Sequence, residues 1–311
     1  MLSRRLGSFL KYNNAYRFAI PAPSYAQARR DKSSYLLNAV EINETQRLDI
    51  QHRMNIHMMH QQLLHPVIPK NLERIADVAT GNATWLLDLI KSRKGASESS
   101  NIKTRYTGFD RSPDLFPRQD TTSSVADIDF ALHDFFKPFP EEHLGKYDLV
   151  HARHLSLAVP VTELSVAVKQ LTSLLKPGGY IQWEEYDYQD QLDACPPCTM
   201  TTTWHVILNW VRDRGYSLHF SNAVRDELAA QGLEIVEKKQ FTTKGLPFSE
   251  DHRLTLLYAF DTGVPRLCLR KKGLGEDEVE RVIKECLEEW ERGILVDYFL
   301  SRVLARRKVD S

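Results

Sequence analysis

Residues 73–84 read Glu-Arg-Ile-Ala-Asp-Val-Ala-Thr-Gly-Asn-Ala-Thr, an apolar stretch that reaches an acid and then a glycine. The apolar residues predict a buried strand ending near Asp77, and Gly81 predicts a tight turn into a helix. A second apolar stretch, Tyr-Thr-Gly-Phe-Asp at 106–110, also ends on an acid, Asp110. Two strands that each end on an acid are typical of a nucleoside-type cofactor site at the carboxyl ends of parallel strands.

Strand and helix patterns alternate along the chain. We expect strands at about 73–78, 103–109, 127–133, 147–152, 180–186, 233–241 and 298–306, and helices at about 43–64, 83–91, 161–176, 201–214, 223–231 and within 251–291. This alternation predicts an α/β fold with a Rossmann-like, seven-stranded, mostly parallel sheet, an antiparallel last strand at its edge, and helical additions at both ends. We divide the chain into a basic arm (1–34), a helical lid (35–70), the cofactor-binding core (71–190) and a C-terminal part of the core with a helical insertion and edge strands (191–311).

Composition excludes several classes of protein. Lys plus Arg number 41, as do Asp plus Glu, so no general positive field attracts nucleic acid. No apolar run approaches the roughly 20 residues that span a membrane. Four cysteines in 311 residues favour a reducing compartment, and we expect the cytoplasm. The basic, acid-free first 30 residues leave a mitochondrial transit peptide as the alternative, and a homodimer stays open.

The helix at 43–64 carries several histidines, His52, His57 and His60 among them. No acid joins them at ligand spacing, so we predict no metal site. The helix is instead a candidate lid over the strand ends.

The turn after the first strand has one glycine, Gly81, flanked by Ala79 and Ala83. Each alanine adds a methyl group and restricts φ, so a bulky pyrophosphate fits poorly and a nicotinamide dehydrogenase is disfavoured. S-adenosylmethionine has no phosphates and therefore needs less space at the turn. We expect Asp77 and the backbone from Ala79 to Asn82 to hold its methionine end.

The adenosine end of this cofactor needs hydrogen-bond acceptors. Asp110 suits the two ribose hydroxyls because a carboxylate only accepts, and Arg111 follows it. Asp134 could accept from the adenine amino group, with Phe135 against the ring. His151, at the end of the strand at 147–152, is the remaining expected contact of the cofactor.

These stretches together resemble a known family. Residues 74–85 look like motif I of class I S-adenosylmethionine-dependent methyltransferases, 108–110 resemble motif II, and 147–153 and 174–180 resemble later motifs. The family usually has glycine at the positions of Ala79 and Ala83. His-Ala-Arg at 151–153, with the helix at 44–52 and Gln-Trp-Glu-Glu at 182–185, looks like the fungal LaeA-like branch, which contains small-molecule methyltransferases and regulators of secondary metabolism.

The resemblance implies methyl transfer to an oxygen or nitrogen of a small organic molecule, in particular a fungal secondary metabolite. The alternative it implies is a LaeA-like regulatory or scaffold protein with little or no catalysis. A hydroxyl or amine acceptor must lose a proton, and a His or a carboxylate beyond the fourth and fifth strands could take it. His154 and Glu185 are the candidate catalytic residues.

Overall fold

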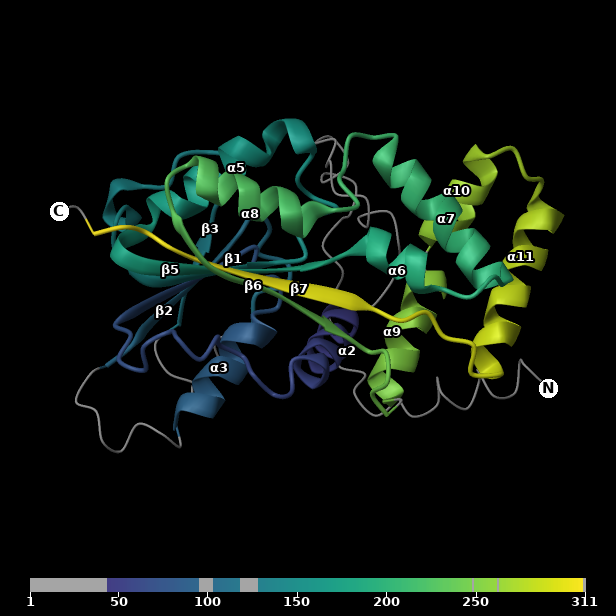
Figure 1. Cartoon of the computed structure of the whole chain (residues 1–311), viewed down its shortest axis with the longest axis horizontal. Helices are drawn as coiled ribbons and strands as arrows, with labels where there is room; N and C mark the ends of the chain where they lie inside the picture. Colours follow the sequence, from purple (N-terminus) through teal and green to yellow (C-terminus); the bar gives the residue numbers. More distant parts are fainter. Residues whose placement is uncertain (1–43, 95–102, 118–127, 248, 262, 310–311) are drawn as a thin grey trace, which may run out of the picture. The chain divides into compact units, whose positions relative to one another are not determined.

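The structure is a computed structural model that describes residues 44–94, 103–117, 128–247, 249–261 and 263–309 (Figure 1). The chain divides into two units, Met1–Ser34 and Tyr35–Ser311, and all described residues belong to the second. The predicted basic arm and the first residue of the predicted lid helix, Asn43, therefore lie outside the described residues.

One seven-stranded sheet organises the described residues, in the order β3-β2-β1-β4-β5-β7-β6. The strands are β1 Arg74–Val78, β2 Arg105–Asp110, β3 Ile128–Leu132, β4 Tyr147–Arg153, β5 Leu175–Tyr186, β6 Glu234–Thr242 and β7 Phe299–Arg306. Only β7 is antiparallel to its neighbours, which confirms the predicted mostly parallel, Rossmann-like fold.

The last strand does not lie at the edge of the sheet, as we expected, but between β5 and β6. Six of the eight residues of β7 are buried, whereas most of β6 is exposed or partly exposed and carries charged side chains such as Glu237 and Lys239. Charged side chains on an edge strand discourage pairing with other chains, so β6 suits the edge and the apolar β7 suits the interior.

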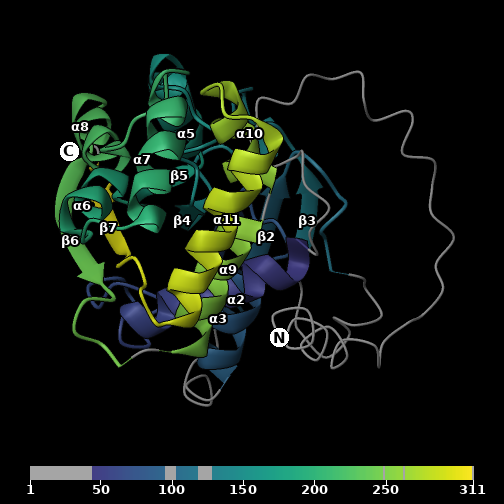
Figure 2. The same cartoon turned by 90° about the vertical axis from the view of Figure 1, so that its right-hand side faces the viewer.

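Helices cover both faces of the sheet (Figure 1). On one face, α5 (Leu164–Ser173) and α8 (Phe220–Ala230) pack in one apolar cluster with β1, β4, β5 and β7. On the other face, α2 (Glu44–Met58) and α3 (Thr84–Lys94) pack in a second cluster. The remaining α-helices of the described residues are α6 (Tyr188–Ala194), α7 (Thr199–Arg212), α9 (Glu250–Asp261), α10 (Gly263–Lys271) and α11 (Glu276–Glu291). They gather beyond the end of β5 on the right of Figure 1, the side that faces the viewer in Figure 2.

One predicted helix boundary is wrong. The N-terminal helix ends at Met58 rather than near residue 64, because His60 and Gln61 take φ values of 52° and 65° and the Gln61 amide donates to the Ile56 carbonyl over 2.8 Å. The region 251–291 is helical, as predicted, and contains three helices. Gly273, with a φ of 95°, reverses the chain between α10 and α11. No described helix is long and apolar enough to cross a membrane.

Candidate active site

The turn between β1 and α3 is left-handed at three alternate residues. Ala79, Gly81 and Ala83 have φ values of 58°, 56° and 58°. A left-handed residue other than glycine costs about 1–2 kcal/mol, so this chain keeps the turn of the glycine-rich motif at the expense of strain at both alanines. The Thr80 amide donates to the Phe109 carbonyl of β2 over 3.0 Å, which ties the turn to the neighbouring strand end.

Asp77 and His151 lie beneath this turn. One Asp77 oxygen accepts from the Thr80 hydroxyl and the other from Nδ1 of His151, both over 2.7 Å. The His151 ring stacks on Trp85 with parallel planes 3.6 Å apart at their centroids, and it is fully buried. Both side chains therefore stabilise the turn from within the sheet, and their direct contact with the cofactor stays a prediction.

Asp110 joins the ends of β1 and β2. One of its oxygens accepts from the Gly81 amide over 2.9 Å and the other from the Ser112 amide over 3.1 Å. Burial raises the pKa of Asp110 above its ordinary value, although these amide donors act in the opposite direction. Asp110 is partly exposed, and its contact with the two ribose hydroxyls of S-adenosylmethionine stays a prediction. Arg111, next in the chain, is exposed.

The residues predicted to contact adenine lie just after β3. An oxygen of Asp134 accepts from the Phe136 amide over 3.1 Å, and the Asp134 carbonyl accepts from the Lys137 amide over 2.9 Å. Phe135 is buried in the apolar cluster beneath α5. Asp134 thus shapes its own turn and is only half-buried, and the adenine contacts stay predictions.

A polar stripe on α2, which the sequence analysis missed, faces the strand ends. It consists of Asp49, His52 and Asn55, which share one helix face because they are three residues apart. Asp49 accepts from the Asn82 side chain over 2.7 Å, His52 lies 2.8 Å from Arg153, and Asn55 lies 2.7 Å from His154. The regular spacing of polar residues in the proposed lid was the available signal.

His154 follows β4 in a left-handed conformation with a φ of 57°. Its ring stacks on Tyr186 at a centroid distance of 4.6 Å, and its Nε2 lies 2.7 Å from the amide nitrogen of Asn55. Burial, and secondly the nearby Arg153, hold the pKa of His154 well below 6.5. The ring is therefore neutral at pH 7.

Glu185, the second candidate catalytic residue, faces away from Tyr186 because neighbours on a strand alternate sides. Its two oxygens accept from the Leu155 amide, the Trp183 indole and the Ser156 amide over 2.7, 2.7 and 3.2 Å. Burial raises the pKa of Glu185 to about 7. The structure thus places Glu185 under the loop that follows His154 and shows no hydrogen bond between these two described residues.

Its neighbour Glu184 lies on the face covered by α2. It accepts from the Arg302 guanidinium and from the Gln182 amide, each over 2.9 Å. Burial alone would raise the pKa of Glu184, but Arg302 and His151 hold it far below the ordinary value. Arg302 also donates to the Gln62 carbonyl over 2.6 Å, so this buried ion pair attaches the segment after α2 to the sheet.

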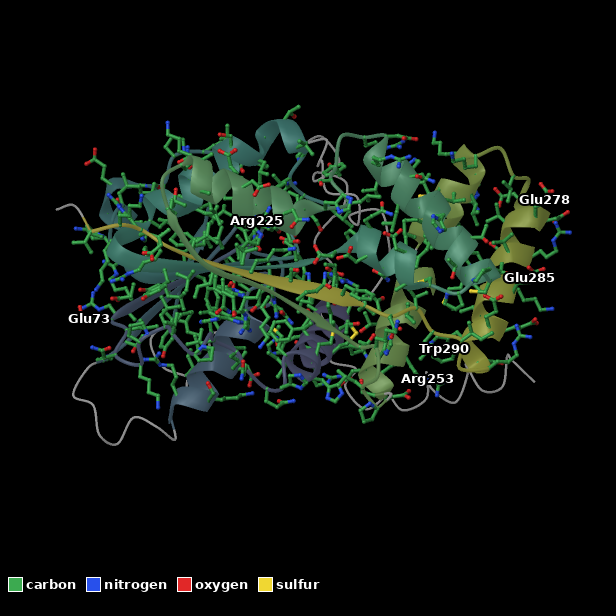
Figure 3. All side chains as sticks on the ribbon, viewed as in Figure 1. Glu73, Arg225, Arg253, Glu278, Glu285 and Trp290 are labelled. Atoms are coloured by element: carbon green, nitrogen blue, oxygen red, sulfur yellow. The ribbon has the colours of Figure 1, made fainter. Side chains whose placement is uncertain are left out.

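A surface hollow lies at the opposite, amino-terminal ends of the strands. It is lined by Pro69, Asn71, Leu72, Glu73, Asp148, Lys176, Gly178, Gly179, Tyr180 and Arg306 (Figure 3, where Glu73 marks this end). Asp148 and Lys176 pair across it. Because β1 and β4 run away from this end, the hollow is separate from the cluster formed by Asp110 and His154.

Comparison with known proteins gives consistent matches. Residues 50–238 match the family model described as a methyltransferase domain. The chain is 30% identical over 290 residues to methyltransferase grgD of Penicillium sp, covering 91% of this chain and 100% of that protein. It is 34% identical over 148 residues to N-methyltransferase tcpN of Claviceps purpurea, covering 46% of this chain and 49% of that protein. It is 32% identical over 157 residues to N-methyltransferase gliN of Aspergillus fumigatus, covering 50% and 51%.

The sheet order with one antiparallel strand, the glycine turn after β1 and the acid at the end of β2 all agree with these matches. The family model covers more than half of the chain, and grgD is related over its whole length. The chain therefore belongs to the methyltransferase domain family and is an S-adenosylmethionine-dependent methyltransferase.

Proposed function

We propose that this methyltransferase moves a methyl group to a nitrogen or oxygen of a small organic molecule of fungal secondary metabolism. The observation that supports this most directly is the position of Asp110 and His154. They lie at the carboxyl ends of β2 and β4, on either side of the β1 turn, and α2 contacts both the turn and His154. Cofactor and acceptor can therefore meet beneath one helix.

The residues of the cofactor half have separate roles in this proposal. Asp110 accepts the ribose hydroxyls and the turn from Ala79 to Asn82 borders the methionine end, while the Thr80 and Gly81 amides keep their bonds to the Phe109 carbonyl and to Asp110. In this proposal Asp134 and Phe135 contact the adenine, and Arg111 borders the ribose. Asp77 and His151 hold the turn in shape from below. The cofactor, when bound, supplies a methyl group attached to a sulfonium sulfur. Transfer of this methyl group leaves the sulfur uncharged.

The chain's own contribution to the rate is mainly positional. Placing a nucleophile on the axis of the breaking bond, away from water, is worth up to about 7–11 kcal/mol in favourable cases. His154 and Tyr186 form the acceptor side in this proposal, and Glu185 holds the backbone of Leu155 and Ser156, which directly follow His154.

The names of two relatives favour nitrogen as the acceptor atom, since tcpN and gliN are both described as N-methyltransferases. These matches span about half of each chain, so the acceptor belongs to the proposal. The second candidate function is the LaeA-like regulator or scaffold. The strained left-handed Ala79 and Ala83 favour it, because they stand where the family usually has glycine.

A transfer experiment separates the two functions. The purified chain would be incubated with methyl-labelled S-adenosylmethionine and a fungal metabolite extract, and both labelled product and S-adenosylhomocysteine would be measured. The methyltransferase gives a labelled small molecule and an equal amount of S-adenosylhomocysteine. A chain that binds the cofactor yet yields neither product above a heat-denatured control would support the scaffold instead.

A further inference from the structure

We propose that Tyr186 and Asn55 form a directed chain of hydrogen bonds that fixes the proton of His154 on Nδ1. His154 then offers the methyl acceptor a hydrogen-bond donor rather than a base. The action on the acceptor rests on the proposed function, whereas the position of the proton does not.

Tyr186 is the first member of the hydrogen-bond chain. Its hydroxyl donates its single proton to the amide oxygen of Asn55 over 2.7 Å. Tyr186 and Asn55 are 3% and 0% exposed, so water does not compete for these bonds.

Asn55 passes this direction on to His154. Because its amide oxygen accepts from Tyr186, its NH₂ group faces Nε2 of His154, at 2.7 Å. An NH₂ group only donates, so Nε2 must accept, and the proton of the neutral ring lies on Nδ1. Protonation of Nε2 would set two donors against each other, which acts in the same direction as the burial that lowers the pKa of His154.

The charged groups around His154 also favour the neutral ring. Among the largest effects of charged neighbours, Arg153, Arg47 and His151 lower its pKa and Glu184 raises it. Nδ1 is buried, and no group in the described part of the chain accepts from it. An unpaired buried donor costs about 1–3 kcal/mol, which a bound molecule with a suitable acceptor would remove.

This arrangement defines the chemical class of the methyl acceptor. The molecule presents a hydrogen-bond-accepting atom, such as a carbonyl oxygen or a ring nitrogen, to Nδ1–H of His154. An amine nitrogen elsewhere in it forms its bond to the methyl carbon with its own lone pair while the carbon–sulfur bond breaks. Its proton is released to water afterwards, so His154 need not act as a base.

Nitrogen-15 NMR of the histidine rings tests the inference directly. The full chain would be labelled, saturated with S-adenosylhomocysteine and observed between about pH 6 and 8, where a neutral ring shows which nitrogen carries the proton. The signal would be assigned by its loss in His154→Gln. We expect the proton on Nδ1 throughout this range. A proton on Nε2 would overturn the inference.

Asn55→Asp tests the direction of the hydrogen-bond chain. It places an acceptor at Nε2 and should raise the pKa of His154, while the exposed Asn71→Asp should not. An unchanged pKa of His154 in Asn55→Asp would contradict the proposal. A proton on Nδ1 without methyl transfer would refute only the proposed function, and transfer with the proton on Nε2 would refute only the hydrogen-bond chain.

Discussion

The Asp77 carboxylate and the His151 imidazole lie 2.7 Å apart on the adjacent strands β1 and β4. They are 3% and 0% exposed, and the same carboxylate accepts from the Thr80 hydroxyl. The turn that faces the cofactor is thus attached to the middle of the sheet by a buried pair. The loss of either partner would leave the other uncompensated in the core.

Asp77→Ala should lower the free energy of unfolding by about 1–3 kcal/mol, the cost of leaving the buried Nδ1–H of His151 without an acceptor. Urea unfolding at pH 7 measures this difference. Asp129→Ala, which removes an exposed acid from β3, is the matched control and should stay within about 0.5 kcal/mol of the unchanged protein. Equal effects of the two substitutions would show that the buried pair does not stabilise the fold.

Asp110→Ala should weaken S-adenosylmethionine binding by about 1.5–3 kcal/mol, the range for hydrogen bonds to a charged group. Titration calorimetry would report this as a roughly 10- to 150-fold rise in Kd. Asp114→Ala removes an exposed carboxylate four residues further on and should leave the Kd unchanged. An unaltered Kd for a folded Asp110→Ala would remove the ribose contact from the proposal.

Ala79→Gly should stabilise the chain by about 0.5–1 kcal/mol. The substitution removes about 1–2 kcal/mol of strain from the left-handed conformation. It also destabilises the folded chain by about 0.4–1 kcal/mol, because glycine gives the unfolded backbone more conformational freedom. The control, Ala229→Gly in the helix α8, should destabilise by about 0.5–1 kcal/mol. Thermal melting compares the two variants, and a lower Tm for Ala79→Gly would mean that the turn is not strained.

The depressed pKa of His154 predicts how stability changes with pH. Below about pH 6.5 the unfolded ring binds a proton that the folded ring does not, so this contribution is complete above pH 6.5 and falls as the pH drops. The loss reaches at most about 1.4 kcal/mol per pH unit.

Urea unfolding at about pH 7.5, 6.5 and 5.5 checks this dependence. His154→Gln removes the titrating ring while keeping an acceptor for Asn55, so its stability should fall less in acid than that of the unchanged chain. Identical slopes for the two proteins would place the pKa of His154 near its ordinary value.

The central strands and the strand-end acids were predictable because their signals are local. The apolar runs before Asp77 and Asp110 indicate buried strands, and Gly81 indicates a turn, whatever surrounds them. The parallel arrangement followed from the alternation with helices. The cofactor followed from these residues and the family they resemble.

The position of β7 could not be read locally. An apolar strand pairs equally well at an edge or in the interior by its own pattern, and pairing between residues far apart in the chain depends on what the neighbouring strands leave available. The charged side chains of β6 indicate an edge strand, but they place β7 in the interior only once the order of the other strands in the sheet is known.

The sequence by itself determined where the strands end and which acids stand at those ends, since periodicity and turn chemistry act over a few residues. The tertiary structure alone decided what those groups touch. By sequence alone, the polar face of α2 formed by Asp49, His52 and Asn55 is typical of a solvent-exposed helix face. In the folded chain α2 covers the sheet, so these residues contact Asn82, Arg153 and His154, and the His154 ring lies against Asn55. The physical reason is that burial, and with it the direction of a hydrogen bond, belongs to partners brought together by folding and not to any residue alone.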